Sequence, residues 1–370
     1  MKELPMIFKT FPVVFALNNN YHIMVLVNEP CLMWVKVGSN EYYDESNGIL
    51  RSSNKIHRMI VPIDELDKEL NYQVVYRKII ERKPYFPLIE EPVFINFKFK
   101  PVKETPINIY HISDAHNKVE TPVKAGSYFK DKLDLLILNG DIPNHSGEIK
   151  YFDTIYEIAG SITKGNIPVI FSRGNHDMRG FYAENLIDYT PHDNGNSYFT
   201  FRLGPLWGVV LDCGEDKDDD HSEYGGTICC HAFRLRQTKF LENIVKNASN
   251  EYGAEGIKHK VVISHIPFTD TFEPPFNIEK DVYAKWVGIL DEHIKPDIMI
   301  CGHMHDTRVD FSDKIHDEKG NQIPIVIGSN PFLNKEDDIF IGAAITLEDN
   351  RINVKFTDHT GKIFNEAKIR

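Results

Sequence analysis

The first hundred residues contain short runs in which apolar and polar positions alternate. In the run 70–77, for example, Tyr72 and Val74 lie on the opposite side from their polar neighbours, and the run 93–100 repeats this pattern. A period of two is typical of half-buried β-strands, and Asn and Gly residues between the runs favour turns. The pattern predicts a small all-β sandwich of the fibronectin or immunoglobulin type over residues 1–103.

After residue 103 the pattern changes to apolar runs that alternate with helical periods. A run that is apolar throughout predicts a strand buried on both faces, and helices that alternate with such strands predict an α/β layered domain, here residues 104–370. The apolar runs are 107–112, 133–138, 167–171, 261–263 and 298–300, and helical periods cover 152–162 and 282–293.

Each of the five apolar runs is followed within a few residues by polar side chains that bind metals well. Asp114 and His116 follow the first run, Asp141 the second, Asn175 and His176 the third, His265 the fourth, and His303 and His305 the fifth. Ligands of α/β sheets bind outside the carboxyl ends of the strands. We therefore expect the five clusters to meet at one edge of the domain.

This mixture of side chains predicts a centre for two divalent cations. Imidazole, carboxylate and amide groups suit Zn, Mn, Fe, Co or Ni better than Ca. Two such ions about 3.5–4 Å apart can share a hydroxide and hold the attacking and leaving oxygens of a phosphate ester. A lone histidine is more often structural than a ligand, but five clusters at five successive strand ends favour the metal centre.

The order of these motifs resembles the calcineurin-like metallophosphoesterase superfamily. The resemblance covers about residues 106–350, and it implies a layered β-sandwich flanked by helices. The motifs are Asp114-Ala115-His116, Gly140-Asp141, Gly174-Asn175-His176-Asp177, His265 and Gly302-His303-Met304-His305.

The resemblance also implies a role for each residue. His176 would lie at the phosphate, as a transition-state stabiliser or as general acid to the leaving oxygen. Asp141 would bridge two divalent ions, with Mn, Fe or Zn expected. One ion would be held by Asp114, His116 and His305, and the other by Asn175, His265 and His303.

An N-terminal β-sandwich followed by a metallophosphoesterase domain is also the domain arrangement of purple acid phosphatases, which this chain resembles in that respect. Two positions of the chain differ from the purple acid phosphatase pattern. Purple acid phosphatases have an iron-binding Tyr where this chain has Asn144, and they lack a ligand at the place of His116. An iron(III)–tyrosinate centre is therefore not expected. Many relatives have an Asp at position 144 that orients the histidine; here an amide would hold His176 without adding a charge.

Four further residues are weaker candidates for substrate contacts. Asn144 and His145 follow the second cluster closely, and Asp212 and His221 belong to the acidic segment 212–226. This segment is either a solvated loop or a lid over the site.

The composition of the chain argues against some classes of binding partner. The net charge of −12 argues against nucleic acid and against an anionic membrane surface. The five cysteines show no paired framework, so reduced thiols and a cytoplasmic location are expected. Pro5, Lys9 and Pro12 interrupt the N-terminal apolar stretch, which argues against a secretory signal.

The sequence thus predicts a dinuclear metal-dependent phosphoesterase. It would hydrolyse a small phosphate mono- or diester through a hydroxide that bridges the metals. The alternatives are a catalytically inactive scaffold with the same fold, which predicts lost ligands, and a nuclease, which would need a basic groove.

Overall fold

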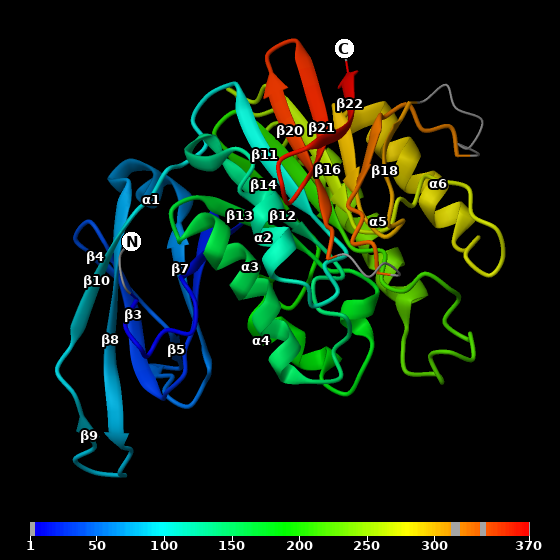
Figure 1. Ribbon diagram of the computed structural model, residues 1–370. Coiled ribbons are helices and arrows are strands. Elements are labelled where there is room, and N and C mark those ends of the chain that lie inside the picture. The colour runs from blue at the N-terminus through cyan, green and yellow to red at the C-terminus, as the bar shows by residue number, and fades with distance from the viewer. Residues whose placement is uncertain (1–3, 312–318, 334–337, 370) are drawn as a thin grey trace.

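The computed structural model describes residues 4–311, 319–333 and 338–369, and its framework is a pair of large β-sheets packed face to face (Figure 1). Helices cover the outer face of each sheet. The N-terminal part extends one of the sheets and adds a third sheet at its side.

The larger sheet has nine strands in the order β22-β21-β20-β11-β12-β13-β1-β2-β7. The parallel strands β11, β12, β13 and β1 lie at its centre, and the other strands pair antiparallel. In chain order the strands are β1 (Val13–Leu17), β2 (Asn20–Leu26), β7 (Ile56–Pro62), β11 (Ile107–Ile112), β12 (Leu135–Asn139), β13 (Pro168–Ser172), β20 (Ile341–Glu348), β21 (Arg351–Asp358) and β22 (Ile363–Ile369).

The second sheet has six strands in the order β14-β15-β16-β17-β19-β18. Strands β15, β16, β17 and β19 run parallel, and β14 and β18 close the two edges antiparallel. The strands are β14 (Phe199–Leu203), β15 (Leu206–Leu211), β16 (His259–Ser264), β17 (Ile298–Cys301), β18 (Thr307–Asp310) and β19 (Ile325–Gly328).

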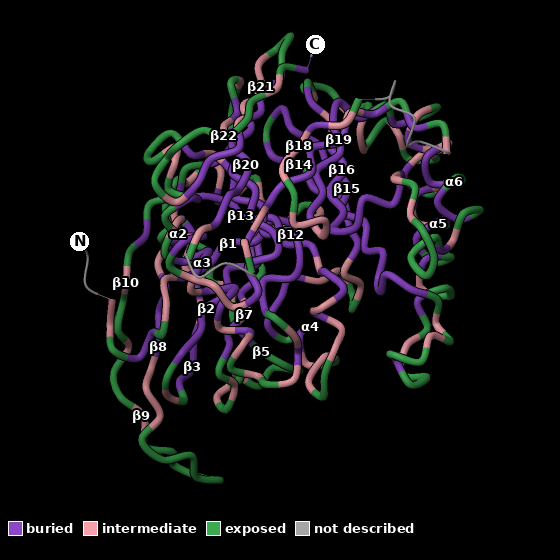
Figure 2. The backbone as a smooth tube through the Cα atoms, turned by 45° about the vertical axis from the view of Figure 1, so that its right-hand side comes forward, coloured by how far each residue is buried: buried purple, intermediate pink, exposed green. Residues whose placement is uncertain are grey.

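The central strands are apolar throughout because both of their faces are buried. In β11, Ile107 and Ile109 belong to the core between the two sheets, whereas Tyr110 and Ile112 belong to the core under the helices. All four side chains are fully buried. Figure 2 shows these buried segments gathered in the two large sheets.

Each large sheet has its own pair of covering helices. Apolar residues of α2 (Glu120–Gly126) and α3 (Asp153–Thr163) share a core with the nine-stranded sheet, and those of α5 (Cys230–Lys246) and α6 (Lys280–Ile289) share one with the six-stranded sheet. The remaining helical segments are α1 (Ile63–Glu69), α4 (Leu186–Tyr189), η1 (Lys130–Lys132), η2 (Ile149–Phe152), η3 (His176–Met178), η4 (Ala183–Asn185) and the π-helix η5 (Leu290–Ile294).

The N-terminal part is a β-sandwich, as the alternating pattern predicts. One layer is β1, β2 and β7, and the other is a sheet in the order β10-β8-β3-β4, with β9 paired to β8. Side chains of both layers meet in one core. The additional strands are β3 (Cys31–Val37), β4 (Asn40–Tyr43), β5 (Glu45–Ser46), β6 (Ile49–Leu50), β8 (Asn71–Glu81), β9 (Leu88–Ile89) and β10 (Val93–Lys98).

The predicted boundary after residue 103 is not a break between sheets. Strand β1 pairs in parallel with β13 of the larger domain, so the nine-stranded sheet contains strands from both sides of the boundary. The division of the chain into domains 1–103 and 104–370 stays a prediction. Among the described residues, no helix is long and apolar enough to cross a membrane.

Candidate metal centre

The predicted ligands come from the carboxyl ends of strands in both large sheets. Residues after β11, β12 and β13 lie on one side, and residues after β16 and β17 lie on the other. The backbone turns sharply at these ends, and five of the candidate ligands have positive φ: Asp114, 55°; His116, 44°; Asp141, 53°; His303, 68°; and His305, 49°. Such φ values are uncommon outside glycine, and they cluster at functional sites.

Two glycines allow the strand ends to approach one another. A Cβ on Gly140, which has a φ of 78°, would lie 2.5 Å from Nδ1 of His265. A Cβ on Gly174 would lie 2.2 Å from Oδ1 of Asp141. Both distances are far below van der Waals contact, so neither position has room for a larger residue without movement of the neighbouring site residue.

The first group of candidate ligands is Asp114, His116 and His305, whose ligand atoms lie within 4.8 Å of one another. The Nε2 atoms of the two histidines are 3.0 Å apart, and Nε2 of His305 is 3.5 Å from Oδ1 of Asp114. The backbone N–H of His303 donates to the Asp114 carboxylate at 3.1 Å, which fixes the carboxylate between the strand ends.

The second group is Asp141, His265 and His303, again with ligand atoms within 4.8 Å of one another. Nε2 of His265 is 3.2 Å from Oδ2 of Asp141. Asn175 joins this group through its Oδ1, which lies 3.1 Å from Nδ1 of His303. The structure thus brings together the same residues that the resemblance assigns to the second ion.

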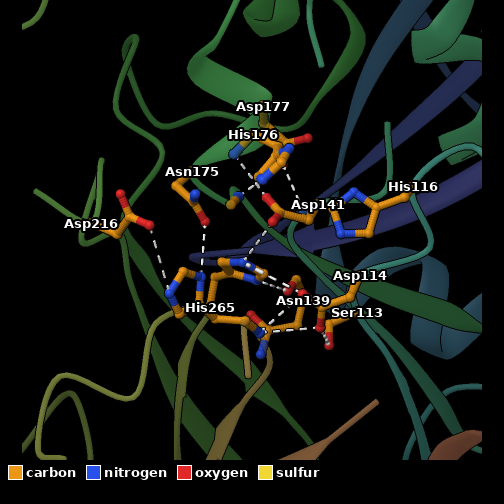
Figure 3. A network of polar contacts seen from close by, with 12 residues as sticks. Ser113, Asp114, His116, Asn139, Asp141, Asn175, His176, Asp177, Asp216 and His265 are labelled. Atoms are coloured by element: carbon orange, nitrogen blue, oxygen red, sulfur yellow. Dashed lines mark hydrogen bonds and ion pairs between the residues drawn. The ribbon is translucent and has the colours of Figure 1, made fainter. Parts of the chain in front are cut away.

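Asp141 lies between the two groups (Figure 3). It forms a third cluster with His116 of the first group and His176, and it contacts His265 of the second. The backbone N–H of His176 donates to Oδ1 of Asp141 at 2.9 Å. A carboxylate in this position can offer one oxygen to each side.

The chemistry of these side chains fits divalent cations. Nδ1–H of His265 donates to the carbonyl of Asn139 at 2.7 Å, so its Nε2 is the atom that faces Asp141. That Nε2 is buried and, apart from its approach to Asp141, has no hydrogen-bond partner among the described residues. A metal-binding histidine is typically oriented in this way, with its second nitrogen held by a carbonyl or a carboxylate.

The pKa values of His265 and Asp141 reflect the close approach of imidazoles and carboxylates in this site. Burial alone would lower the pKa of His265, but the carboxylates of Asp141 and Asp114 raise it to about 10. Burial would raise the pKa of Asp141, yet His265, His176 and His116 bring it well below the usual range. Without a cation, a proton on His265 partly balances the carboxylates, and a divalent ion would replace that proton.

His176 lies beside the two groups, and its ring is held by the backbone. Nδ1–H donates to the carbonyl of Asn144 at 2.9 Å. The sequence suggested that the side-chain amide of Asn144 would hold this ring; the structure places the backbone carbonyl there. The ring packs edge-on against His116, with centroids 4.9 Å apart.

Two residues near the centre were not found from the sequence. Nη1 of Arg179 is 3.4 Å from Nε2 of His176, and Oδ2 of Asp216 is 3.9 Å from Nε2 of His303. Arg179 is anchored by a bidentate pair with Glu215 at 2.8 and 2.7 Å. The sequence signal for Arg179 is its place on the turn after His176; Asp216 gives no signal that distinguishes it from its acidic neighbours.

Asp177, in the third motif, links the segments that follow β12 and β13 through hydrogen bonds to their backbone. Its Oδ2 accepts from the backbone N–H groups of Gly174 at 2.8 Å and of Asp141 at 3.2 Å. Burial and the charge of Asp141 raise the pKa of Asp177 to about 8.

Three of the weaker substrate candidates make contacts with residues outside the metal groups. Nδ1 of His145 accepts from the N–H of Gly147 at 2.9 Å. Asp212 is buried and pairs with Arg173 at 2.7 Å. The ring of His221 packs on Tyr224. In the segment 212–226 it is therefore Asp216, rather than Asp212 or His221, that approaches the centre.

Comparisons with known structures agree with this fold. The structure of the purple acid phosphatase PPD1 from yellow lupin (Lupinus luteus) seeds matches with a TM-score of 0.62 and 12% identity, over 98% of this chain and 75% of that one. The structure of PhoD matches with a TM-score of 0.56 and 10% identity, over 100% of this chain and 94% of that one. At these identities the matches show a shared fold.

A search of curated proteins gave no match. The sequence model of the calcineurin-like phosphoesterases matches residues 107–307, more than half of the chain and all of the motifs described above. The family implies divalent metals, and the donor groups at the strand ends suit them. The chain therefore belongs to the calcineurin-like phosphoesterase family.

Proposed function

We propose that this protein is a hydrolase of phosphate esters that works with two divalent cations. The observation that carries the proposal is the arrangement of two ligand groups that both approach one carboxylate, that of Asp141. The first group is Asp114, His116 and His305, and the second is Asn175, His265 and His303. Mn, Fe and Zn are the candidate ions, since all accept mixed nitrogen and oxygen ligands.

When bound, two divalent cations supply charge stabilisation for the phosphate and lower the pKa of a water molecule. Asp141 would contribute to holding both ions, and its carboxylate accepts from the backbone N–H of His176. His176 and Arg179 place two further nitrogen groups beside the same centre. Arg179 brings a permanent positive charge, which suits a phosphate oxygen.

The state of His176 decides what it can do. As a neutral ring with its proton on Nδ1, its Nε2 accepts a hydrogen bond from Arg179. Donation from Nε2 to a phosphate oxygen or to the leaving oxygen requires the doubly protonated ring. We propose that His176 lies beside the phosphate of the bound substrate, as a transition-state stabiliser or as general acid to the leaving oxygen.

We propose a small phosphomonoester or phosphodiester as the substrate. The net charge of −12 is poorly suited to a polynucleotide, which gains its affinity from positive groups. A cytoplasmic location stays a prediction of the sequence.

The proposal is tested with protein stripped of metal and refilled with Mn²⁺. Hydrolysis of p-nitrophenyl phosphate and bis-p-nitrophenyl phosphate should require the metal, and Asp141→Asn should lower the rate at least about 100-fold. The exposed Asp131, which belongs to none of the ligand groups, gives the matched control Asp131→Asn, with an unchanged rate. Metal binding without hydrolysis of any ester would favour a scaffold, and preferred cleavage of single-stranded DNA would favour a nuclease.

A further inference from the structure

The carboxylate of Asp114, in the first ligand group, has two oxygens with different surroundings. Oδ1 faces the imidazoles of other candidate ligands, at 3.5 Å from Nε2 of His305 and 3.9 Å from Nε2 of His265. Oδ2 accepts a hydrogen bond from the hydroxyl of Ser113 at 2.5 Å (Figure 3). The backbone nitrogen of His303 lies 3.1 Å from both oxygens. Oδ1 is therefore the oxygen that faces the other ligand atoms.

Ser113 lies where the two large sheets meet. It follows β11 of the nine-stranded sheet directly, and its backbone N–H donates to Oγ of Ser329, which follows β19 of the six-stranded sheet, at 3.0 Å. Ser113 is fully buried. A Cβ on Gly302, after β17, would lie 2.3 Å from Oγ of Ser113 and 2.9 Å from Oδ2 of Asp114. Three strand ends thus enclose the hydroxyl beside the carboxylate.

The hydroxyl of Ser113 has one proton and two acceptors within reach. Besides Oδ2 of Asp114, the backbone carbonyl oxygen of Gly328 lies 3.1 Å from Oγ. A serine hydroxyl donates a single hydrogen bond, and an ionised carboxylate is a stronger acceptor than a neutral carbonyl. Since a carboxylate must be ionised to bind a metal, the proton is directed to Asp114 in the state that binds the ion.

A carboxylate can bind a metal ion through one oxygen or through both. Ca²⁺ takes about six to eight oxygen ligands and often uses both oxygens of a carboxylate. Transition ions that accept imidazole nitrogens need fewer oxygen ligands. A hydrogen bond from Ser113 to Oδ2 leaves Oδ1 as the ligand atom of Asp114. This arrangement suits a transition ion better than Ca²⁺.

We infer that Ser113 is a positioning residue of the metal centre, and that its hydroxyl restricts Asp114 to one ligand oxygen, Oδ1. The restriction favours Mn²⁺ over Ca²⁺ at the first ligand group, Asp114, His116 and His305. The inference rests on the proposed function, because it concerns one of the two cations of that centre. Ser113 acts through Asp114 and needs no contact with the ion or with the substrate.

The test measures metal binding by calorimetry, without any substrate. Metal-free protein is titrated with Mn²⁺, in the absence and in the presence of a fixed excess of Ca²⁺, which gives the affinities for both ions. Ser113→Ala removes the hydroxyl without adding volume. One of the two Mn²⁺ ions should bind at least about tenfold more weakly to this variant, and the ratio of the Ca²⁺ affinity to the Mn²⁺ affinity should rise about fivefold or more.

Ser172→Ala is the matched control. Ser172 is also fully buried and is the last residue of β13 in the same sheet, but its hydroxyl has no hydrogen-bond partner among the described residues. Both affinities should keep their wild-type values in this variant. A residue with a merely structural role would change the affinities for both ions alike. An equal loss for Mn²⁺ and Ca²⁺ in Ser113→Ala, or an unchanged Mn²⁺ affinity, would therefore overturn the inference.

The inference and the proposed function can fail separately. Binding of two Mn²⁺ ions with the expected effect of Ser113→Ala, but without hydrolysis of any ester, would count against the hydrolase alone. Hydrolysis of p-nitrophenyl phosphate by wild-type protein with two Mn²⁺ ions, together with an unchanged ion preference in Ser113→Ala, would count against the role of Ser113 alone.

Discussion

At the scale of single residues, the account depends most on how closely the strand ends approach. Gly174 illustrates this, because its Cβ position overlaps the carboxylate of Asp141. We expect Gly174→Ala to move that carboxylate away from the ligand groups and to weaken Mn²⁺ binding at least about tenfold. Calorimetric titration of the metal-free variant measures this directly.

Gly288, within α6, provides the matched control, because a Cβ there has no heavy atom within 4 Å. Gly288→Ala should bind metal normally and gain up to about 1 kcal/mol of stability, as expected for alanine in a helix. Equal metal affinities in the two alanine variants would contradict the tight approach of Asp141 to Gly174.

Residue identity was sufficient to find the candidate ligands, because each follows a buried strand directly. Residue identity did not reveal that Asp216 lies near the candidate ligands. Its approach to His303 depends on the conformation of the segment after β15, in which Asp216 contacts Arg179 and Tyr224. Nor could the sequence show that a backbone carbonyl, rather than the Asn144 side chain, holds His176. Both results depend on loop conformation, which apolar periodicity does not encode.

At the scale of elements, the packing of α1 on β2 introduces a pH dependence. Tyr21 of β2 donates to Asp67 of α1 at 2.8 Å, and burial raises the pKa of Asp67 from 3.8 to about 6 despite this hydrogen bond. The folded protein thus favours the protonated carboxyl. The associated stability is fully present below about pH 4 and is lost as the pH rises through 6.

Asp67→Asn cannot ionise, so it should retain this stability at high pH. We expect its Tm to exceed that of the wild type by about 2 °C or more at pH 8, with a smaller difference at pH 4.5. Thermal unfolding at pH 8 and at pH 4.5, monitored by circular dichroism, measures this difference in Tm. Asp281→Asn, at an exposed position in the first turn of α6, is the control. A larger gain at pH 4.5 than at pH 8 would contradict the burial of this carboxyl.

The elements themselves were predicted to different degrees. The run 107–112 coincides with β11, and the helical period 152–162 falls on η2 and α3, because burial on one or two faces leaves a clear pattern. The period 282–293 predicts one helix, but the α-helix α6 changes to the π-helix η5 after Ile289. Hydrophobic periodicity does not distinguish these two hydrogen-bonding patterns over a single turn.

At the scale of the whole molecule, β1 connects the N-terminal sandwich to the larger domain. Its parallel pairing with β13 and the core shared by both parts lead us to expect one cooperative unfolding transition. The tryptophans allow a direct measurement, since Trp34 lies in β3 and Trp207 and Trp286 lie around the six-stranded sheet. Urea unfolding of variants that keep only Trp34 or only Trp286 should give coincident midpoints.

Separate midpoints in these variants would show that the two parts unfold independently. The connection itself could not be anticipated from the sequence, because an apolar pattern can indicate a strand but not the strand that pairs with it. Pairing between residues 14 and 168 depends on contacts far apart in the chain.

The central claim is that two metal ions act together around Asp141. It is tested most directly by adding Mn²⁺ in known equivalents to metal-free protein and following both the bound metal and the hydrolysis of p-nitrophenyl phosphate. We predict binding of two ions per chain, with full activity only after the second, and a loss of at least about 100-fold in Asp141→Asn. Full activity with one ion, or without any metal, would contradict the account.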